Sequence, residues 1–186
     1  LRIVDARTPS AAREVGAYDP PDGALGIDVA AERAYLAEGG AGLRIADVSD
    51  PSRPRTLAVD EGSMGASNVH VRGELAFLSV GAELLVVDVA NPTAAHVVGA
   101  RTTCGAAKDV FVEGDHAYVA ADFAGLVVIG IADPARLSDV GRVPQPPRPP
   151  ARGVASAVRV ADGRAYVANG DAGLWVLDVG DPAAPR

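Results

Sequence analysis

The sequence lacks most of the residues and runs that identify a particular chemistry. Its 186 residues include one cysteine, Cys104, which excludes a disulfide within the chain and leaves no zinc-binding pattern of cysteines. No apolar run approaches the roughly 18 residues that a helix needs to cross a bilayer, so no membrane-spanning segment is predicted. Aromatic residues make up only 4%, and the apolar 48% is mostly alanine, valine and leucine, which favours closely stacked sheets.

Positive charge is also scarce. The 24 acidic residues outnumber the 17 basic ones and give a net charge of -7, which makes nucleic acid an unsuitable partner. The chain has no Gly-x-Ser-x-Gly elbow, no Gly-Lys-Ser/Thr phosphate loop and no Cys-x-x-Cys pair. We therefore assign no catalytic residue, no metal ligand and no cofactor.

What the sequence does contain is a repeat. The motif Leu-x-Ile/Val-x-Asp-Val-x-Asp/Asn-Pro, with some variation, ends at five prolines that are 42, 41, 42 and 48 residues apart: Pro9, Pro51, Pro92, Pro134 and Pro182. An aromatic residue keeps step with them at four positions: Tyr35, Phe77, Tyr118 and Tyr166. Two independent residue types with one period indicate a repeat fold.

Each repeat is predicted to form four short strands. In one copy they are residues 27–29, 33–37, 43–48 and 56–59, and the Gly-rich or two-residue links between such runs predict antiparallel hairpins. Nearly continuous apolar runs, such as residues 84–87, indicate strands covered on both faces. The predicted fold is therefore all-β, a β-propeller of four-stranded antiparallel blades with about four repeats of ~42 residues. A parallel β-helix is the alternative, but its coils are usually shorter and lack hairpins.

We take residues 1–186 as a single propeller domain or a fragment of one. The repeats are expected at approximately 1–25 (partial), 26–66, 67–107, 108–155 and 156–186 (partial). They hold five copies of the third strand and four of each other strand, 17 in all, whereas a closed four-bladed ring needs 16. We therefore expect an open arc of a larger ring, with a closed ring that displaces one terminal strand as the alternative. Because the chain begins inside a repeat, we expect it to be a piece of a longer protein.

An open arc leaves its end blades uncovered. We expect exposed apolar residues at both ends, with Val4 at one and Trp175 and Leu177 at the other. Self-association through these open blade ends is the predicted consequence.

The repeat resembles that of the LVIVD-repeat family of propeller proteins. Residues 43–51 are the clearest match and residues 174–182 the next, while Gly130 replaces the usual aspartate and Ala6 the usual valine. The resemblance implies a bacterial or archaeal exported or surface protein, hence an extracellular, cell-surface or periplasmic location. The family has no agreed catalytic motif, so the resemblance favours a non-enzymatic binding or interaction scaffold. The alternative is a propeller enzyme, such as a lactonase-like hydrolase or a lyase, with its site at the mouth of the central channel.

The first strands of the repeats would line that channel. They offer four different residues at one repeat position: Asp28, His70, Phe111 and Arg159. An enzyme would need carboxylates, amides and histidines that converge from several blades, and the phenylalanine and the arginine interrupt such a set. The other two histidines, His96 and His116, fall in strands of other types and do not complete a metal site.

The predicted binding surface lies on these strands and on the loops before them, where the repeat stops repeating. Its residues are Asn68, His70, Lys108, Asp109 and Arg159. One carboxylate with cations and an amide suits a polar or anionic partner, such as a protein or a glycan. Lys108 is the only lysine of the chain, and its favoured interpretation is that of a solvated loop charge paired with Asp109.

Three other features are interpreted as structural. The residues before the prolines of the last four copies are expected to close turns by accepting backbone N–H groups, since a calcium site would need more carboxylates in one loop. They are Asp50, Asn91, Asp133 and Asp181. Cys104 is expected to be a buried or half-buried loop residue. Residues 145–150, Gln-Pro-Pro-Arg-Pro-Pro, favour polyproline II and are interpreted as a stiff surface loop.

Overall fold

The computed structural model of the protein describes residues 1–145 and 153–186, and nearly all regular structure in these ranges is β-strand. One strand pair comes first, followed by three four-stranded sheets and one three-stranded sheet. The described residues hold no helix with the length and hydropathy that crossing a bilayer requires.

The strand bounds follow the repeat. The pair is β1 (Arg2–Asp5) and β2 (Arg13–Ala17), and the next sheet is β3 (Gly26–Ala30), β4 (Arg33–Glu38), β5 (Gly42–Asp47) and β6 (Arg55–Asp60). The third sheet is β7 (Ala66–Arg72), β8 (Leu75–Val80), β9 (Glu83–Asp88) and β10 (His96–Thr102). The fourth is β11 (Asp109–Glu113), β12 (His116–Ala120), β13 (Leu126–Gly130) and β14 (Ser138–Val143), and the last is β15 (Ala157–Ala161), β16 (Arg164–Ala168) and β17 (Leu174–Asp178). Four single 3-10 turns complete the elements: η1 (Pro9–Ala11), η2 (Glu61–Ser63), η3 (Pro92–Ala94) and η4 (Gly170–Ala172).

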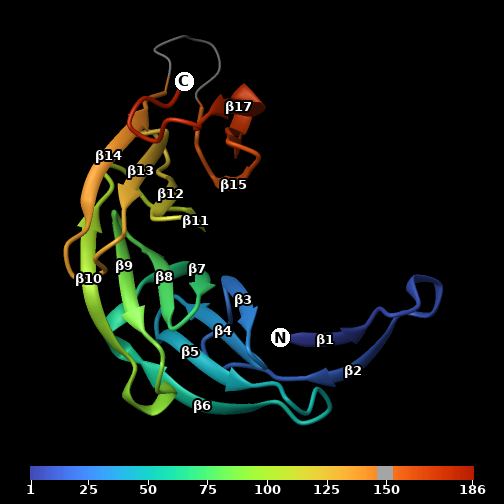
Figure 1. The fold of residues 1–186 in the computed structure, drawn as a ribbon. Coiled ribbons are helices and arrows are strands. Elements are labelled where there is room, and N and C mark those ends of the chain that lie inside the picture. The colour runs from blue at the N-terminus through green and yellow to red at the C-terminus, as the bar shows by residue number, and fades with distance from the viewer. Residues whose placement is uncertain (146–152) are drawn as a thin grey trace.

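The sheets follow one another around an open arc (Figure 1). Within each sheet the strands lie in chain order and pair antiparallel. The first strands β3, β7, β11 and β15 contact their counterparts in the neighbouring sheets on the inner side of the arc, while β6, β10 and β14 form its outer side. This arrangement is that of propeller blades, and it confirms the predicted all-β fold.

The two ends of the arc remain separate. In the part of the chain that the structure describes there are 17 strands, the number expected from the repeat. The β1–β2 pair and the β15–β17 sheet are not joined by strand pairing in these residues. The open arc is therefore confirmed, and the closed four-bladed ring with one displaced strand is wrong.

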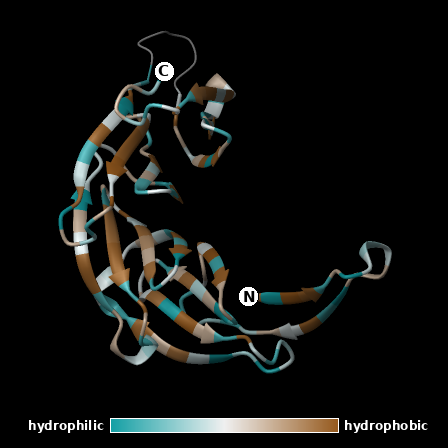
Figure 2. Cartoon of the chain, viewed as in Figure 1, coloured by the Kyte–Doolittle hydropathy of each residue, from teal (hydrophilic) through white to brown (hydrophobic). Residues whose placement is uncertain are grey.

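Three hydrophobic clusters fill the junctions between neighbouring sheets. In the first of them, Tyr35, Leu43 and Ile45 of one sheet pack against Val69 and Val71 of the next. The same repeat positions form the other two clusters. Because side chains alternate in direction along a strand, the second and third strands supply a cluster on each face. Figure 2 shows the resulting hydrophobic run along β9 and β13.

The outer strands carry a β-bulge at one repeat position. In every pair of third and fourth strands the register shifts at the same place. Next to the shift, Gly99 of β10 lies directly against the carbonyl group of Pro134 in the following repeat. Gly16 and Gly141 make the same approach to the equivalent prolines.

This approach leaves no room for a side chain, so replacing Gly99 by alanine should destabilise the fold. A Cβ atom at position 99 would overlap the carbonyl oxygen of Pro134. Since β6 has an alanine, Ala58, at this position, the backbone has some freedom to shift, and we expect a loss of about 1–3 kcal/mol in the free energy of unfolding. Urea denaturation measures it. Gly40→Ala is the control, because nothing lies near that exposed turn residue, and an equal loss in both variants would contradict the packing argument.

Candidate functional site

The first strands bring four side chains into one row along the inner side of the arc. This inner row consists of Asp28 on β3, His70 on β7, Phe111 on β11 and Arg159 on β15. Asp28 Oδ2 lies 3.4 Å from His70 Nδ1, and the rings of His70 and Phe111 have centroids 5.0 Å apart. The guanidinium carbon of Arg159 lies 5.8 Å from the centre of the Phe111 ring. One repeat position thus forms a continuous contact across four sheets.

Asp109, on β11, links three of these sheets through hydrogen bonds to β7 and β15. Its buried carboxylate accepts a hydrogen bond from Asn68 Nδ2 at 2.7 Å through Oδ1. Through Oδ2 it accepts the backbone N–H of Val158 at 2.8 Å and Nη1 of Arg159 at 2.7 Å. Asp109 is therefore a brace between sheets that also fixes the position of the arginine.

Asp28 braces the first two complete sheets in a related way. Its Oδ2 accepts the backbone N–H of Val71 at 2.7 Å, and its Oδ1 accepts that of Val29 at 2.8 Å. Burial lowers the pKa of the neighbouring His70 imidazole, and the Asp28 carboxylate partly opposes this shift. His70 is therefore neutral at pH 7, and its contact with Asp28 is a polar contact and no ion pair at that pH.

Four of the five predicted binding residues gather in this region. Asn68, His70, Asp109 and Arg159 are linked through the contacts given above, while Lys108 lies apart. Its ammonium group is 3.9 Å from Asp122, so the expected pairing of Lys108 with Asp109 is wrong. Consecutive residues of an extended chain point to opposite sides, which sends the two charges in different directions.

The prediction left two members of the inner row out of the binding surface. Asp28 and Phe111 contact His70 directly, and the guanidinium of Arg159 lies over the ring of Phe111. The signal that could have found them is their shared repeat position, which Arg159 and His70 occupy as well. Residues at one position of consecutive blades are neighbours in space, whatever their chemistry.

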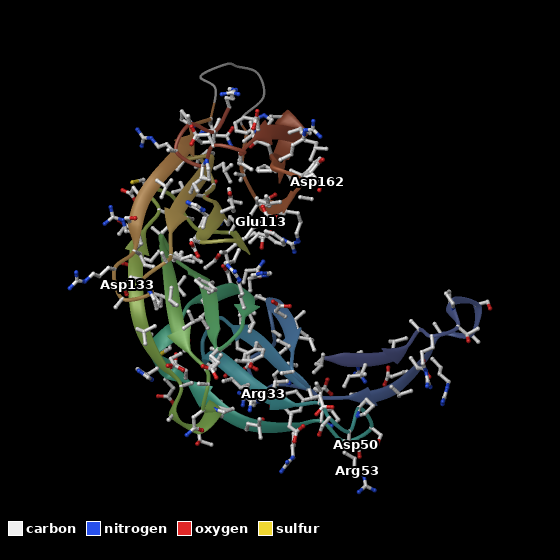
Figure 3. The ribbon with its side chains drawn as sticks, viewed as in Figure 1. Arg33, Asp50, Arg53, Glu113, Asp133 and Asp162 are labelled. Atoms are coloured by element: carbon white, nitrogen blue, oxygen red, sulfur yellow. The ribbon has the colours of Figure 1, made fainter. Side chains whose placement is uncertain are left out.

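The acidic turns lie elsewhere, on the outer rim, where Figure 3 shows Asp50 and Asp133. Asp50 accepts the backbone N–H of Ser52 at 3.0 Å and its hydroxyl at 2.6 Å. The other members, Asn91, Asp133 and Asp181, each accept the N–H two residues further on. The structural interpretation of these turns is confirmed.

A second set of acidic residues closes the third strands. The hydroxyl and backbone N–H of Ser49, followed by Arg55, lower the pKa of Asp47 to about 2. Asp5, Asp88 and Asp178 accept the N–H two residues further on in the same manner. These carboxylates are engaged within their own turns. Among residues 1–145 and 153–186, no three acidic, histidine or cysteine side chains come together as a metal site would require.

Two loop predictions have different outcomes. Cys104 was expected to be buried or half-buried, but it is exposed; it lies in the loop between β10 and β11 with a φ of 59°. Of the proline-rich run 145–150, only Gln145 lies within the described residues. Its side-chain amide exchanges hydrogen bonds with that of Asn169.

Comparison with known proteins agrees with the repeat and the fold. A family model described as LVIVD repeat matches residues 24–58, 65–103, 104–144 and 152–186. No curated protein matches the chain.

Two crystal structures of computationally designed proteins are similar in fold. The designed Ika4 protein has a TM-score of 0.65 at 9% identity, over 90% of this chain and 99% of its own. The designed Ika8 protein has a TM-score of 0.67 at 9% identity, over 91% of this chain and 50% of its own. The chain thus spans half the length of Ika8, and at this identity the likeness concerns the fold alone.

Proposed function

The chain belongs to the LVIVD-repeat family, and we propose that it is a non-enzymatic binding scaffold whose inner row contacts a polar or anionic partner, a protein segment or a glycan. We further propose, from the usual setting of the family, that it works in an exported or cell-surface protein. The repeat-built scaffold supports the first statement, because its strands supply a stable wall on which single positions vary freely between blades.

One observation carries the proposal: the fixed position of Arg159. Its side chain is 66% exposed, yet Asp109 holds one end of the guanidinium and Phe111 lies under it. An exposed arginine is normally mobile, and ordering it on binding is unfavourable. The contacts with Asp109 and Phe111 already order the Arg159 side chain in the free protein. Its remaining N–H groups therefore have a defined geometry that matches carboxylate oxygens.

The hydrogen-bond balance of the region indicates which partner fits. Both oxygens of Asp109 accept hydrogen bonds from protein groups, and so do both oxygens of Asp28. Arg159 has donors left over, because only its Nη1 donates hydrogen bonds to the described residues, and its Nε and Nη2 do not. A partner rich in acceptors, such as an acidic peptide or a glycan with uronic acid groups, complements this set.

Replacing Arg159 by glutamine should therefore weaken binding about tenfold or more, the usual effect of losing a hydrogen bond to a charged group. A panel of acidic peptides and uronic-acid glycans provides the probes, with affinities measured by calorimetry. Arg136→Gln is the matched control, because Arg136 is 87% exposed and its ion pair is with Asp133 of the same outer turn.

Two further variants place the surface. Lys108→Ala tests the loop beside the inner row, and Asp50→Ala tests the outer rim. Loss of binding in Asp50→Ala alone, with the fold intact, would move the site to the outer rim and reject the proposal. Stoichiometric calcium or zinc in the purified protein would instead favour the competing class, a lactonase-like hydrolase or a lyase.

A further inference from the structure

The first complete sheet presents an apolar face that every other sheet has covered. On β7, β11 and β15 the two valines of the first strand are at most 9% exposed, because the preceding sheet packs on them; they are Val69 and Val71, Val110 and Val112, and Val158 and Val160. The residues at the same positions of β3, Ile27 and Val29, are 48% and 59% exposed. The β1–β2 pair supplies only the third and fourth strands of a preceding blade, and among the described residues it leaves Ile27 and Val29 of β3 uncovered.

The last sheet presents the opposite half of the same junction. In the complete sheets an aromatic residue of the second strand and two aliphatic residues of the third fill the junction and are at most 3% exposed; in the first of these sheets they are Tyr35, Leu43 and Ile45. Their counterparts at the end of the arc, Tyr166, Leu174 and Val176, are 37%, 64% and 52% exposed.

These are the uncovered residues of the last sheet, and Trp175 and Leu177, expected to be exposed, lie on its other face. There they pack against the cluster shared with the preceding sheet. The expectation had the right strand and the wrong face, since a shift of one residue reverses the direction of every side chain.

We propose that two copies of this chain join head to tail, with Tyr166, Leu174 and Val176 of each copy packed against Ile27 and Val29 of the other, and so form one closed ring. The proposed contact uses the same repeat positions as the three junctions inside the arc, which are already packed in this way. The two ends of this arc lie apart and share no sheet, as Figure 1 shows, and in the proposed ring the second copy supplies the complementary face.

The curvature of the arc agrees with a ring of two copies. The chain matches the designed Ika8 protein over 91% of its own length but only 50% of that chain, so an arc of this shape occupies half of a fold twice as long. Rotational closure matters, because a head-to-tail contact that does not close would continue into an open filament. Two equal arcs close after one half-turn each.

The number of strands at the new junction requires a rearrangement. The last sheet brings β15–β17 and the partner's first end brings β1–β2, which makes five strands where a blade holds four. β1 is the strand that leaves, because it has four paired positions with β2, whereas β17 has five with β16 and also buries Trp175 and Leu177. β2 then pairs with β17.

The edge of β17 is already prepared for such a neighbour. Backbone hydrogen bonds join Asp178 and Arg186 in both directions. Asp47 and Arg55 are partners at the corresponding position, and so are Asp5 and Arg13. Arg186 thus occupies the first place of a fourth strand. In the ring Arg186 would leave this place, and Arg13 of the partner copy would take it.

Analytical ultracentrifugation of the 186-residue chain over a concentration series tests the proposal. The unaltered chain, of 18.8 kDa, should form a discrete dimer. Val29→Asp and Val176→Asp should each weaken dimerisation by about a hundredfold or more, because an unpaired carboxylate would be buried in an apolar junction. Phe123→Asp is the control: Phe123 is 63% exposed in a loop of a middle sheet, and its dimer should persist.

Mixing the two variants gives the decisive result. A mixed pair contains one junction with both substitutions and one with neither, so an equimolar mixture should regain dimer that neither variant forms alone. Amide exchange at Ile3 should become faster on dimerisation while exchange at Val176 becomes slower, as β1 leaves and β17 gains a neighbour. A monomer at all concentrations, an open series of larger species, no recovery on mixing, or unchanged exchange in β1 would each overturn the proposal.

Discussion

Replacing Arg44 by methionine is expected to lower the free energy of unfolding by about 3–5 kcal/mol, the usual effect of removing one partner of a buried ion pair. Glu38 is completely buried and Arg44 is 8% exposed. The pair is bidentate, with Nε to Oε1 at 2.6 Å and Nη2 to Oε2 at 2.8 Å, and the hydrogen bond to Glu38 raises the pKa of Arg44. Methionine keeps much of the packing volume but leaves the carboxylate without a cation.

Two comparisons separate the buried charge from the loss of packing. In the double variant Glu38→Leu with Arg44→Met no charge remains, and most of the stability should return. Arg101→Met removes an arginine of the same bidentate geometry, with Asp139, from an exposed position and should change stability little. Chemical denaturation measures all three variants. If Arg44→Met and Arg101→Met behave alike, burial is not what makes the first pair important.

The second large effect is expected at Asp109. Asp109→Ala removes the acceptor for Asn68, Arg159 and the backbone N–H of Val158, and it leaves that buried N–H without a partner. A loss of about 2–4 kcal/mol follows from charged hydrogen bonds and one unsatisfied donor. The loss should be local, because Asp109 ties β15 to the sheet before it.

Hydrogen exchange distinguishes this local effect from general destabilisation. The amide of Val158 should exchange faster in Asp109→Ala, while amides of β4 and β5 keep their protection. Asp109→Asn retains one acceptor oxygen and should fall between the variant and the unaltered protein. Asp133→Ala is the matched acidic control, since Asp133 accepts the N–H of Ala135 in an exposed outer turn. Equal acceleration in β4 would contradict a bracing role for Asp109.

Much of the architecture follows from the sequence because each copy of the repeat gives independent evidence for the same arrangement of strands. The five prolines and four aromatic residues fix one period, and hairpin turns between short apolar runs fix the strand order within it. The strand number and the open arc were both predictable in this way. Bulges and 3-10 turns were not, because they depend on how the outer strands bend around the next repeat.

The candidate site could be predicted only in part, because it is built between repeats. Repeat position placed His70 and Arg159 on the inner side, and in the structure both lie beside the Phe111 ring. The side-chain partners of Asp109 lie 41 and 50 residues away in sequence, and no local sequence pattern predicts them. The predicted ion pair of Lys108 with Asp109 was wrong because the two residues are adjacent in sequence, and the extended backbone directs their side chains apart.

The three hydrophobic clusters share no residue, and this separation governs the order in which the chain loses its structure. Each sheet is coupled only to its immediate neighbours, so stability is close to a sum of single-sheet and nearest-neighbour contributions. The sheets β7–β10 and β11–β14 each contribute to two clusters, and the sheets beside them to one. In a single arc we therefore expect heat or denaturant to unfold the two end sheets first, with the middle sheets as the last cooperative unit to unfold, whereas closure into a ring would remove this order.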